Sequence, residues 1–234
     1  MVAVAANHDV VVVVPAYNEA GVLADVLTSL QEHFSHVVVV DDGSRDGSAD
    51  VARAAGATVL RHPLNLGQGA ALQTGFDYVV RHTDARYVVT FDSDGQHDPV
   101  DAVAMVQAAR TSGVHVVLGS RTLGTAQHQP PLRRAVLRLA LLFTRATTGL
   151  PLSDSHNGLR VLSRQAVAVL RLRQRGMAHA SELLMAIAGS GLTWVEHPVN
   201  ITYTEYSLSK GQSNLNAFNV LYDLTVDRLV RARS

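Results

Sequence analysis

The sequence predicts an α/β fold in which a mostly parallel central sheet is flanked by helices within a single domain. Two kinds of segment alternate along the first half of the chain. Short, continuous apolar runs bounded by turn residues are typical of strands that are buried on both faces. Between these runs, apolar residues recur at helical spacing. Strict alternation of strand and helix favours a parallel sheet with helices on both sides.

The first half contains five apolar runs of strand length, and the second half is less regular. The runs cover residues 10–14, 37–40, 58–60, 87–91 and 114–118. Between them, helices are expected around residues 22–30, 71–80 and 103–109. In the second half, helical patterns cover residues 132–148, 163–172, 178–190 and 215–231. Residues 193–203 are expected to form one or two strands interrupted at Pro198, and residues 154–160 a loop.

The composition excludes several classes of protein. The 234 residues include no cysteine, which rules out a disulfide framework, thiolate metal sites and cysteine nucleophiles. Aromatic residues make up only 5%, so we expect no stacking platform and no nucleic-acid partner. The most apolar stretches, residues 10–15 and 135–143, are shorter than the ~18–20 residues that span a bilayer. Residues 1–9 carry no Lys or Arg, unlike a secretory signal, so a cytoplasmic protein is expected.

Charge is divided unevenly between the two halves of the chain. Residues 1–129 contain 7 Arg and 14 Asp or Glu, a net charge of −7. Residues 130–234 contain 12 Arg, one Lys and 6 Asp or Glu, a net charge of +7. An acidic half suits a divalent cation, and a basic half suits phosphate or an anionic membrane. A dipolar, solvated surface is the simpler alternative.

The strongest chemical signal is the pair Asp92 and Asp94, which directly follows the fourth apolar run. Two carboxylates at this spacing beside a buried strand are costly unless something neutralises them. Mg²⁺ or Mn²⁺, bound by a few carboxylates and by substrate phosphate oxygens, would do so. Gln96 can add a neutral oxygen, and the neighbouring His97 is a candidate for a functional role. The alternative is a pair of turn and capping residues before the helix near Pro99.

Two further motifs stand where the chain leaves a strand. Asp41 and Asp42 can accept hydrogen bonds from ribose hydroxyls or a base edge, or they form an Asx turn with Asp46 capping the next helix. Residues 65–69 (Asn-Leu-Gly-Gln-Gly) open a helix where an anion can approach, although a tight turn explains them nearly as well. Because ligands bind at the carboxyl ends of parallel strands, these motifs should converge on one rim of the sheet.

A basic stripe is expected on the helix at residues 132–148. At 100° per residue, Arg134, Arg138 and Arg145 fall within about 40° of one another, and apolar residues occupy most other directions. Such a helix can lie on an anionic membrane surface, or it is a packed helix with one solvated face.

Together, segments 15–19, 41–44, 65–69 and 92–96 resemble glycosyltransferase family 2 in order and spacing. Gly119-Ser120-Arg121 and Gly158-Leu159-Arg160 are similar to motifs of its dolichyl- or polyprenyl-phosphate mannose synthase branch. The resemblance covers about residues 10–215 and implies the GT-A fold, a single nucleotide-binding α/β domain. It implies a nucleotide-sugar and metal half at residues 8–125 and an acceptor half with a C-terminal helix at residues 126–234.

The activity implied by this resemblance is an inverting, metal-dependent transfer. A sugar would move from a nucleotide diphosphate sugar, of the GDP-mannose or UDP-glucose type, to a polyprenyl or dolichyl phosphate. The metal would be Mg²⁺ or Mn²⁺. Because no membrane span is evident in the sequence, contact with the inner face of the cell membrane is expected to be peripheral or through a membrane-protein partner.

The resemblance also implies roles for individual residues. The residues that would hold the nucleotide are Pro15, Tyr17, Asn18, Glu19, Val40 and Asp42. Asp92, Asp94 and Gln96 would hold the metal and the diphosphate. The arginines implied on the phosphate and acceptor side are Arg121, Arg134 and Arg160. The chain departs from the branch at its Arg-x-x-Gly-x-Ser-Lys pattern, where Leu208 replaces the Arg and Lys210 would supply the missing charge.

Three alternatives remain open on the sequence. A family 2 enzyme acting on a hydroxyl of a soluble metabolite or cell-envelope glycan would need a general base, for which Asp154 and Glu182 are the candidates. A nucleotidyltransferase also uses a metal on an α/β sheet, but residues 15–19 lack its Gly-rich, basic loop. A non-catalytic binding module fits poorly with an intact Asp92 and Asp94 pair.

Overall fold

The computed structural model describes residues 7–127, 131–155, 157–174 and 178–202. A seven-stranded sheet lies at its centre, in the order β3-β2-β1-β4-β6-β5-β7. The strands are β1 (Val10–Ala16), β2 (Val37–Asp41), β3 (Thr58–Arg61), β4 (Tyr87–Thr90), β5 (Val116–Gln127), β6 (Arg160–Ser163) and β7 (Trp194–Thr202). Only β6 among them runs antiparallel to its neighbours, so the prediction of a mostly parallel sheet is confirmed.

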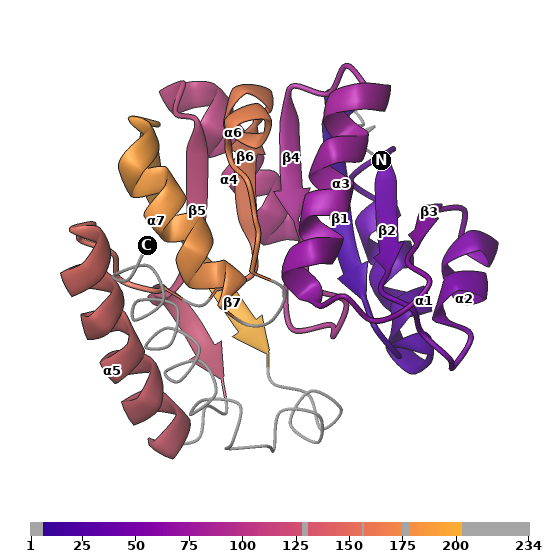
Figure 1. Ribbon diagram of the computed structural model, residues 1–234, viewed down its shortest axis with the longest axis horizontal. Helices are drawn as coiled ribbons and strands as arrows, with labels where there is room; N and C mark the ends of the chain where they lie inside the picture. The colour runs from indigo at the N-terminus through magenta and orange to yellow at the C-terminus, as the bar shows by residue number, and fades with distance from the viewer. Residues whose placement is uncertain (1–6, 128–130, 156, 175–177, 203–234) are drawn as a thin grey trace, which may run out of the picture.

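Helices cover both faces of this sheet (Figure 1). They are α1 (Ala20–Gln31), α2 (Ser48–Ala54), α3 (Gln68–His82), α4 (Pro99–Ser112), α5 (Pro131–Thr148), α6 (Arg164–Val169) and α7 (His179–Ser190). In Figure 1, α3 and α7 lie in front of the sheet and α4 lies behind it. The helices expected from apolar spacing in the described residues are therefore present, and the one expected at residues 215–231 lies outside the described part of the chain.

The continuous apolar runs follow from burial on both faces. Successive side chains of β1 point to opposite faces, and Val12 packs into the core beneath α1 and α4 while Val13 packs into the core beneath α3. Each face therefore needs an apolar residue at every second position, and the two patterns combine into the unbroken valine run. Because β1, β2 and β4 run parallel, their carboxyl ends lie at the same edge of the sheet, and the polar residues follow there.

The structure corrects the sequence-based expectation at residues 160–163 and decides between its two alternatives at residues 194–202. Residues 160–163 form the short strand β6, which inserts between β4 and β5 with Thr90 paired to Arg160. A four-residue strand that begins with a buried arginine has no alternating or continuous apolar pattern, so it was not predicted. Residues 194–202 form one strand, because β7 lies at the sheet edge, where the missing N–H of Pro198 interrupts no second ladder.

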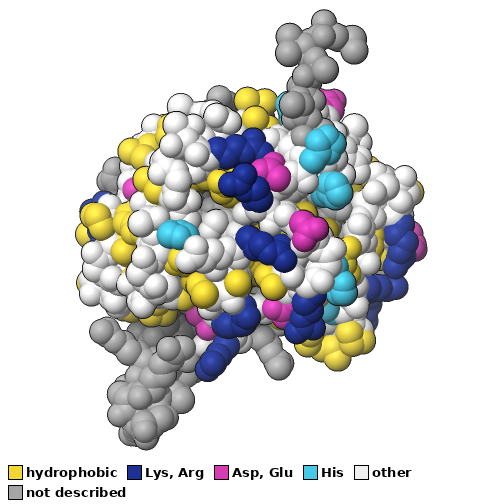
Figure 2. Space-filling model, turned by 90° about the horizontal axis from the view of Figure 1, so that it is seen from above, with side chains coloured by type: hydrophobic (Ala, Val, Ile, Leu, Met, Phe, Trp, Pro, Cys, Tyr) yellow, Lys and Arg dark blue, Asp and Glu magenta, His cyan; other side chains and the backbone are white. Residues whose placement is uncertain are grey.

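The end of the sheet at which the parallel strands begin carries a mixed surface. Figure 2 looks down on this end and shows arginine side chains spread among acidic side chains and histidines. Near the amino end of β1, Arg110 at the end of α4 forms an ion pair with Asp9. In the described residues, none of the helices combines the length and the apolar character needed to cross a bilayer.

Candidate active site

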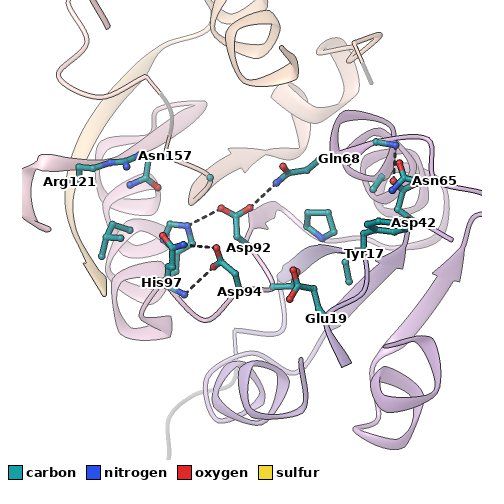
Figure 3. A pocket seen from close by; sticks show the side chains of 18 residues that line it. Tyr17, Glu19, Asp42, Asn65, Gln68, Asp92, Asp94, His97, Arg121 and Asn157 are labelled. Atoms are coloured by element: carbon teal, nitrogen blue, oxygen red, sulfur yellow. Dashed lines mark hydrogen bonds and ion pairs between the residues drawn. The ribbon is translucent and has the colours of Figure 1, made fainter. Parts of the chain in front are cut away.

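A cavity of about 440 Å³ opens at the carboxyl ends of β1, β2 and β4. Eight of the residues assigned to the site from the sequence line it: Pro15, Tyr17, Glu19, Asp42, Asp92, Asp94, Gln96 and Arg121. Figure 3 shows the two aspartates between Tyr17 and Asp42 on one side and Arg121 on the other. The prediction that these motifs converge on one rim is therefore confirmed.

Asp92 is held from two sides at the floor of the cavity. Its Oδ1 accepts a hydrogen bond of 2.9 Å from Nε2 of Gln68, the first residue of α3. Its Oδ2 accepts one of 3.2 Å from Nε2 of His97. Gly158 packs so closely against this carboxylate that an added Cβ would lie 2.0 Å from Oδ2 of Asp92. The carboxylate is thus fixed in one orientation before any ligand arrives.

Asp94 faces the same cavity but has a different environment. Its Oδ1 accepts the backbone N–H of Gln96 at 3.1 Å, and its Oδ2 accepts the side-chain amide of Gln96 at 2.8 Å. The amide nitrogen of Gln96 is therefore committed to Asp94, while its carbonyl oxygen is an acceptor that a cation can use.

The two carboxyl groups differ in their tendency to ionise. Burial and the negative charge of Asp92 raise the pKa of Asp94 to about 6. Burial alone would also raise the pKa of Asp92, but the hydrogen bond and charge of His97, with the charges of Arg160 and His179, bring it below its usual value. The pair therefore carries one firmly ionised carboxylate and one that stays protonated more readily than usual.

These residues fit a hard divalent cation that completes its coordination with substrate oxygens. In the described residues, no cluster of three or more His, Asp or Glu side chains could hold a metal ion by itself. Mg²⁺ is typically bound through one or two carboxylates together with waters and substrate phosphates. Asp92, Asp94 and the carbonyl of Gln96 match that kind of site.

Asp42 lines the cavity, yet its carboxylate is largely committed to the protein. Oδ1 accepts hydrogen bonds from Nδ1 of His62 at 2.7 Å and from the backbone N–H of Leu66 at 2.8 Å. Oδ2 accepts the backbone N–H of Gly67 at 2.7 Å. Asp42 therefore organises the turn at residues 65–67 that precedes α3. The sequence did not indicate His62 as a partner of Asp42, and it singled out Gln68 only within the motif 65–69 and not as a partner of Asp92, because each pair is far apart in the chain.

The loop after β1 is tied to the loop after β2. The backbone N–H of Asn18 donates to Oγ of Ser44 at 2.9 Å, and Oδ1 of Asn18 accepts the backbone N–H of Arg45 at 3.0 Å. Asn18 has a positive φ of 54°, a conformation that asparagine tolerates better than most residues. Asn18 thus lies outside the cavity lining, as does Val40, which is fully buried in β2.

An arginine of β5 lines the cavity and is paired with an aspartate from the second half of the chain. Nε of Arg121 lies 2.6 Å from Oδ2 of Asp154, and the backbone N–H of Arg121 donates to the same oxygen at 3.1 Å. Arg160 is buried on β6 beneath the cavity floor and does not line it. Burial lowers the pKa of its guanidinium, against the opposing effects of Asp92 and Asp154.

Neither candidate base lines the cavity as a free carboxylate. Asp154 is paired with Arg121. Glu182 accepts the backbone N–H groups of Arg173 and Gln174 at 2.9 and 2.8 Å and so holds a loop beside α7.

The predicted basic helix is present as α5 (Pro131–Thr148). Arg134 and Arg138 lie on it, but their side chains are outside the described part of the structure. Nε of Arg145 donates to the backbone carbonyl of Leu152 at 2.5 Å, so this arginine ties the end of α5 to the following loop. Leu139 and Leu142 on the same helix are 57% and 60% exposed. Lys210 lies outside the described residues.

Comparison with known proteins gives the family of this chain. The family model described as Glycosyl transferase family 2 matches residues 11–171. A UDP-N-acetylglucosamine–dolichyl-phosphate N-acetylglucosaminyltransferase of Methanococcus voltae is 30% identical, over 94% of this chain and 96% of that protein. A polyprenol monophosphomannose synthase of Mycolicibacterium smegmatis is 27% identical, over 85% of this chain and 79% of that protein.

Solved structures agree on the fold. Glucosyl-3-phosphoglycerate synthase from Mycobacterium tuberculosis, crystallised with Mn²⁺, UDP and glucosyl-3-phosphoglycerate, superposes with a TM-score of 0.68. It is 21% identical, and the match covers 92% of this chain and 78% of that one. This similarity supports the GT-A arrangement of sheet and helices. With a family model spanning most of the sequence, the chain belongs to glycosyltransferase family 2.

Proposed function

We propose that this enzyme transfers a sugar from a nucleotide diphosphate sugar to the phosphate of a polyprenyl or dolichyl lipid, in a reaction that requires Mg²⁺ or Mn²⁺. The observation that carries the donor half is the pair Asp92 and Asp94, with its opposed pKa shifts, at the floor of the 440 Å³ cavity. The relatives named for dolichyl-phosphate and polyprenol acceptors support the acceptor half.

On the donor side, the residues of this chain fix the position of the diphosphate. Asp92, Asp94 and Gln96 would hold the cation, which supplies positive charge to the leaving diphosphate. Gln68 and His97 hold the Asp92 carboxylate in one orientation, so little reorganisation is needed when the donor binds. Tyr17 and Glu19, which also line the cavity, are proposed to contact the nucleotide.

On the acceptor side, a phosphate nucleophile is favoured because, in the described residues, both carboxylates considered as a general base are engaged by other groups. A phosphate oxygen is already an anion, so attack on the sugar requires no strong general base, whereas a hydroxyl requires one. Asp154 is paired with Arg121, and Glu182 is committed to backbone N–H groups. Arg121 lines the cavity and is proposed to orient the incoming phosphate.

The lipid chain of such an acceptor needs an apolar surface beside the site. We propose that α5, which carries Arg134 and Arg138, provides it at the inner face of the membrane. The exposure of Leu139 and Leu142 supports this contact. Attachment would be peripheral, alone or with a membrane-protein partner.

A donor screen tests the proposal. Purified protein is incubated with UDP- and GDP-linked sugars, Mn²⁺ or Mg²⁺, and a short polyprenyl phosphate, and the lipid product is identified by mass spectrometry. We expect one donor to give a glycosyl phosphate lipid, and chelator to abolish it. Transfer only to hydroxyl acceptors would favour the family 2 enzyme of soluble or cell-envelope glycans instead.

A further inference from the structure

A chain of hydrogen bonds leads from the cavity to a histidine that does not line it. Asp42 lines the cavity, and its Oδ1 accepts a hydrogen bond from Nδ1 of His62. On the far side of the same ring, Nε2 of His62 lies 2.9 Å from Oγ1 of Thr74, on α3. His62 directly follows β3, and its own backbone N–H donates to the carbonyl of Asp41 at 2.9 Å. The imidazole is therefore held at both ring nitrogens, and the backbone of His62 is tied to β2.

Burial makes these bonds necessary. Asp42 is only 3% exposed, and a carboxylate in such a place needs donors for its charge. A carboxylate oxygen can only accept, so Nδ1 of His62 carries a hydrogen and donates it to Oδ1. In the tautomer that is protonated at Nδ1, Nε2 accepts from the hydroxyl of Thr74. His62 thus supplies the one side-chain donor among the three groups bonded to Asp42 in the described structure.

The same carboxylate sets the start of α3. Its other two bonds come from the backbone N–H groups of Leu66 and Gly67, and Gln68 is the next residue. The side chain of Gln68 donates to Asp92, as the dashed line in Figure 3 shows. A displacement of the Asp42 carboxylate therefore moves the turn, and the turn carries the group that orients the metal-side carboxylate.

We propose that His62 is a positioning residue that couples the nucleotide side of the cavity to its metal side. It holds the Asp42 carboxylate, Asp42 holds the turn before α3, and Gln68 at the start of α3 holds Asp92. Loss of the bond between His62 and Asp42 should weaken nucleotide and metal binding together. This inference rests on the proposed donor and metal site, but it is independent of the acceptor.

Two substitutions, each of which preserves the position of one ring nitrogen of His62, separate this positioning role from packing. The side-chain amide of His62→Asn can place nitrogen near the position of Nδ1, so it keeps a donor for Asp42 and loses the contact with Thr74. The amide of His62→Gln can place nitrogen near Nε2, so it keeps the contact with Thr74 and loses the donor for Asp42. A third variant, Thr74→Val, removes only the outer bond. His36→Gln, at an exposed position before β2, is the matched control.

Binding is measured by calorimetry with Mn²⁺ alone and with UDP and GDP in the presence of Mn²⁺, and folding by thermal unfolding. A hydrogen bond to a charged group contributes enough that we expect His62→Gln to weaken both affinities about tenfold. His62→Asn, Thr74→Val and His36→Gln should stay within about threefold of the parent. In turnover assays, His62→Gln should raise the donor KM more than it lowers kcat.

Three results would overturn the inference. The first is a His62→Gln variant that binds Mn²⁺ and nucleotide like the parent. The second is an equal loss for Asn and Gln that tracks only a fall in Tm, which would indicate packing. The third is a parent protein that binds neither Mn²⁺ nor nucleotide, which would also overturn the proposed donor site. If the Asn and Gln variants differ as expected while no lipid phosphate is glycosylated, the inference stands and the acceptor assignment fails.

Discussion

Replacing Gly158 with alanine should disable the metal side of the cavity without replacing any proposed ligand. An added Cβ would lie 2.0 Å from Oδ2 and 2.6 Å from Cγ of Asp92, whereas ordinary contacts begin at 3.4 Å. The carboxylate or the segment around Gly158 must therefore move by about 1.4 Å to restore the Oδ2 contact to 3.4 Å. Such a movement would break or lengthen the bonds of Asp92 to Gln68 and His97, which are 2.9 and 3.2 Å long.

The expected loss of activity follows from this displacement. A misplacement of about 1 Å can cost on the order of 10²-fold in rate, and metal ligands must lie within about 0.2 Å of their ideal distances. We therefore expect Gly158→Ala to lower kcat/KM at least about 100-fold and Mn²⁺ affinity at least about tenfold. Losing about 1–2 kcal/mol from the altered hydrogen bonds would lower Tm by only a few degrees.

The assay combines Mn²⁺ calorimetry, steady-state kinetics and thermal unfolding, with Gly189→Ala as the control. Gly189 lies in α7, and a Cβ there would meet nothing within 4 Å. Because alanine favours the helix over glycine by about 0.8–1 kcal/mol, this control should be as stable as the parent or more so. If Gly158→Ala bound Mn²⁺ within threefold of the parent at an unchanged Tm, the packing of Asp92 against Gly158 would not control the site.

The remaining predictions concern the same cavity and α5. Asp94→Asn should abolish transfer while the protein stays folded, and near-normal activity of this variant in chelator would disprove the metal role. Because the pKa of Asp94 is raised to about 6, protons compete with the cation, so Mn²⁺ affinity measured by calorimetry should fall as the pH drops through 6. In the metal-free protein, protonation of Asp94 stabilises the fold, because its pKa is higher in the folded chain than in the unfolded one. This stabilisation is complete below about pH 4 and is lost as the pH rises through about 6. Thermal unfolding at several pH values should show this pH dependence in the parent and not in Asp94→Asn. Asp42→Ala should raise the donor KM more than it lowers kcat, with a lower Tm because two backbone N–H groups lose their acceptor; a fall in kcat alone at unchanged KM would contradict this. Changing Arg134, Arg138 and Arg145 to Gln should weaken sedimentation with anionic liposomes, because each arginine contributes about 1 kcal/mol to the free energy of membrane binding. Arg145 should contribute least, since it also donates to the carbonyl of Leu152. Unchanged sedimentation of the triple variant would show that α5 is an ordinary packed helix.

The strands that bear the site, and the edge of the sheet at which it lies, were predictable because they depend on residues that are neighbours in the sequence. An unbroken valine run such as that of β1 reports burial on both faces, and a parallel sheet collects whatever follows its strands at one edge. Asp92 and Asp94 were identified in this way, since a pair of carboxylates after a buried strand calls for a counter-charge. The pKa of Asp94, raised to about 6, reflects that requirement.

The features that could not be predicted from the sequence depend on contacts between residues that are far apart along the chain. The side chain of His62 meets Asp42 across 20 positions, and Gln68 meets Asp92 across 24. β6 is defined by pairing with β4 and β5, not by its own four residues. For the same reason, Asp42 was predicted as a nucleotide ligand or as part of a local Asx turn, whereas most of its hydrogen-bonding capacity holds the distant turn before α3.

The central claim is that the nucleophile is a lipid phosphate, and one competition experiment tests it most directly. The preferred donor is offered, with Mn²⁺, to an equimolar mixture of a short polyprenyl phosphate and the polyprenol of the same chain length. Since the two acceptors differ only in the phosphate, any preference reports the chemistry of the nucleophile. We predict that the sugar appears only on the polyprenyl phosphate, and that Asp94→Asn forms neither product. Glycosylation of the polyprenol at a comparable rate would contradict the account.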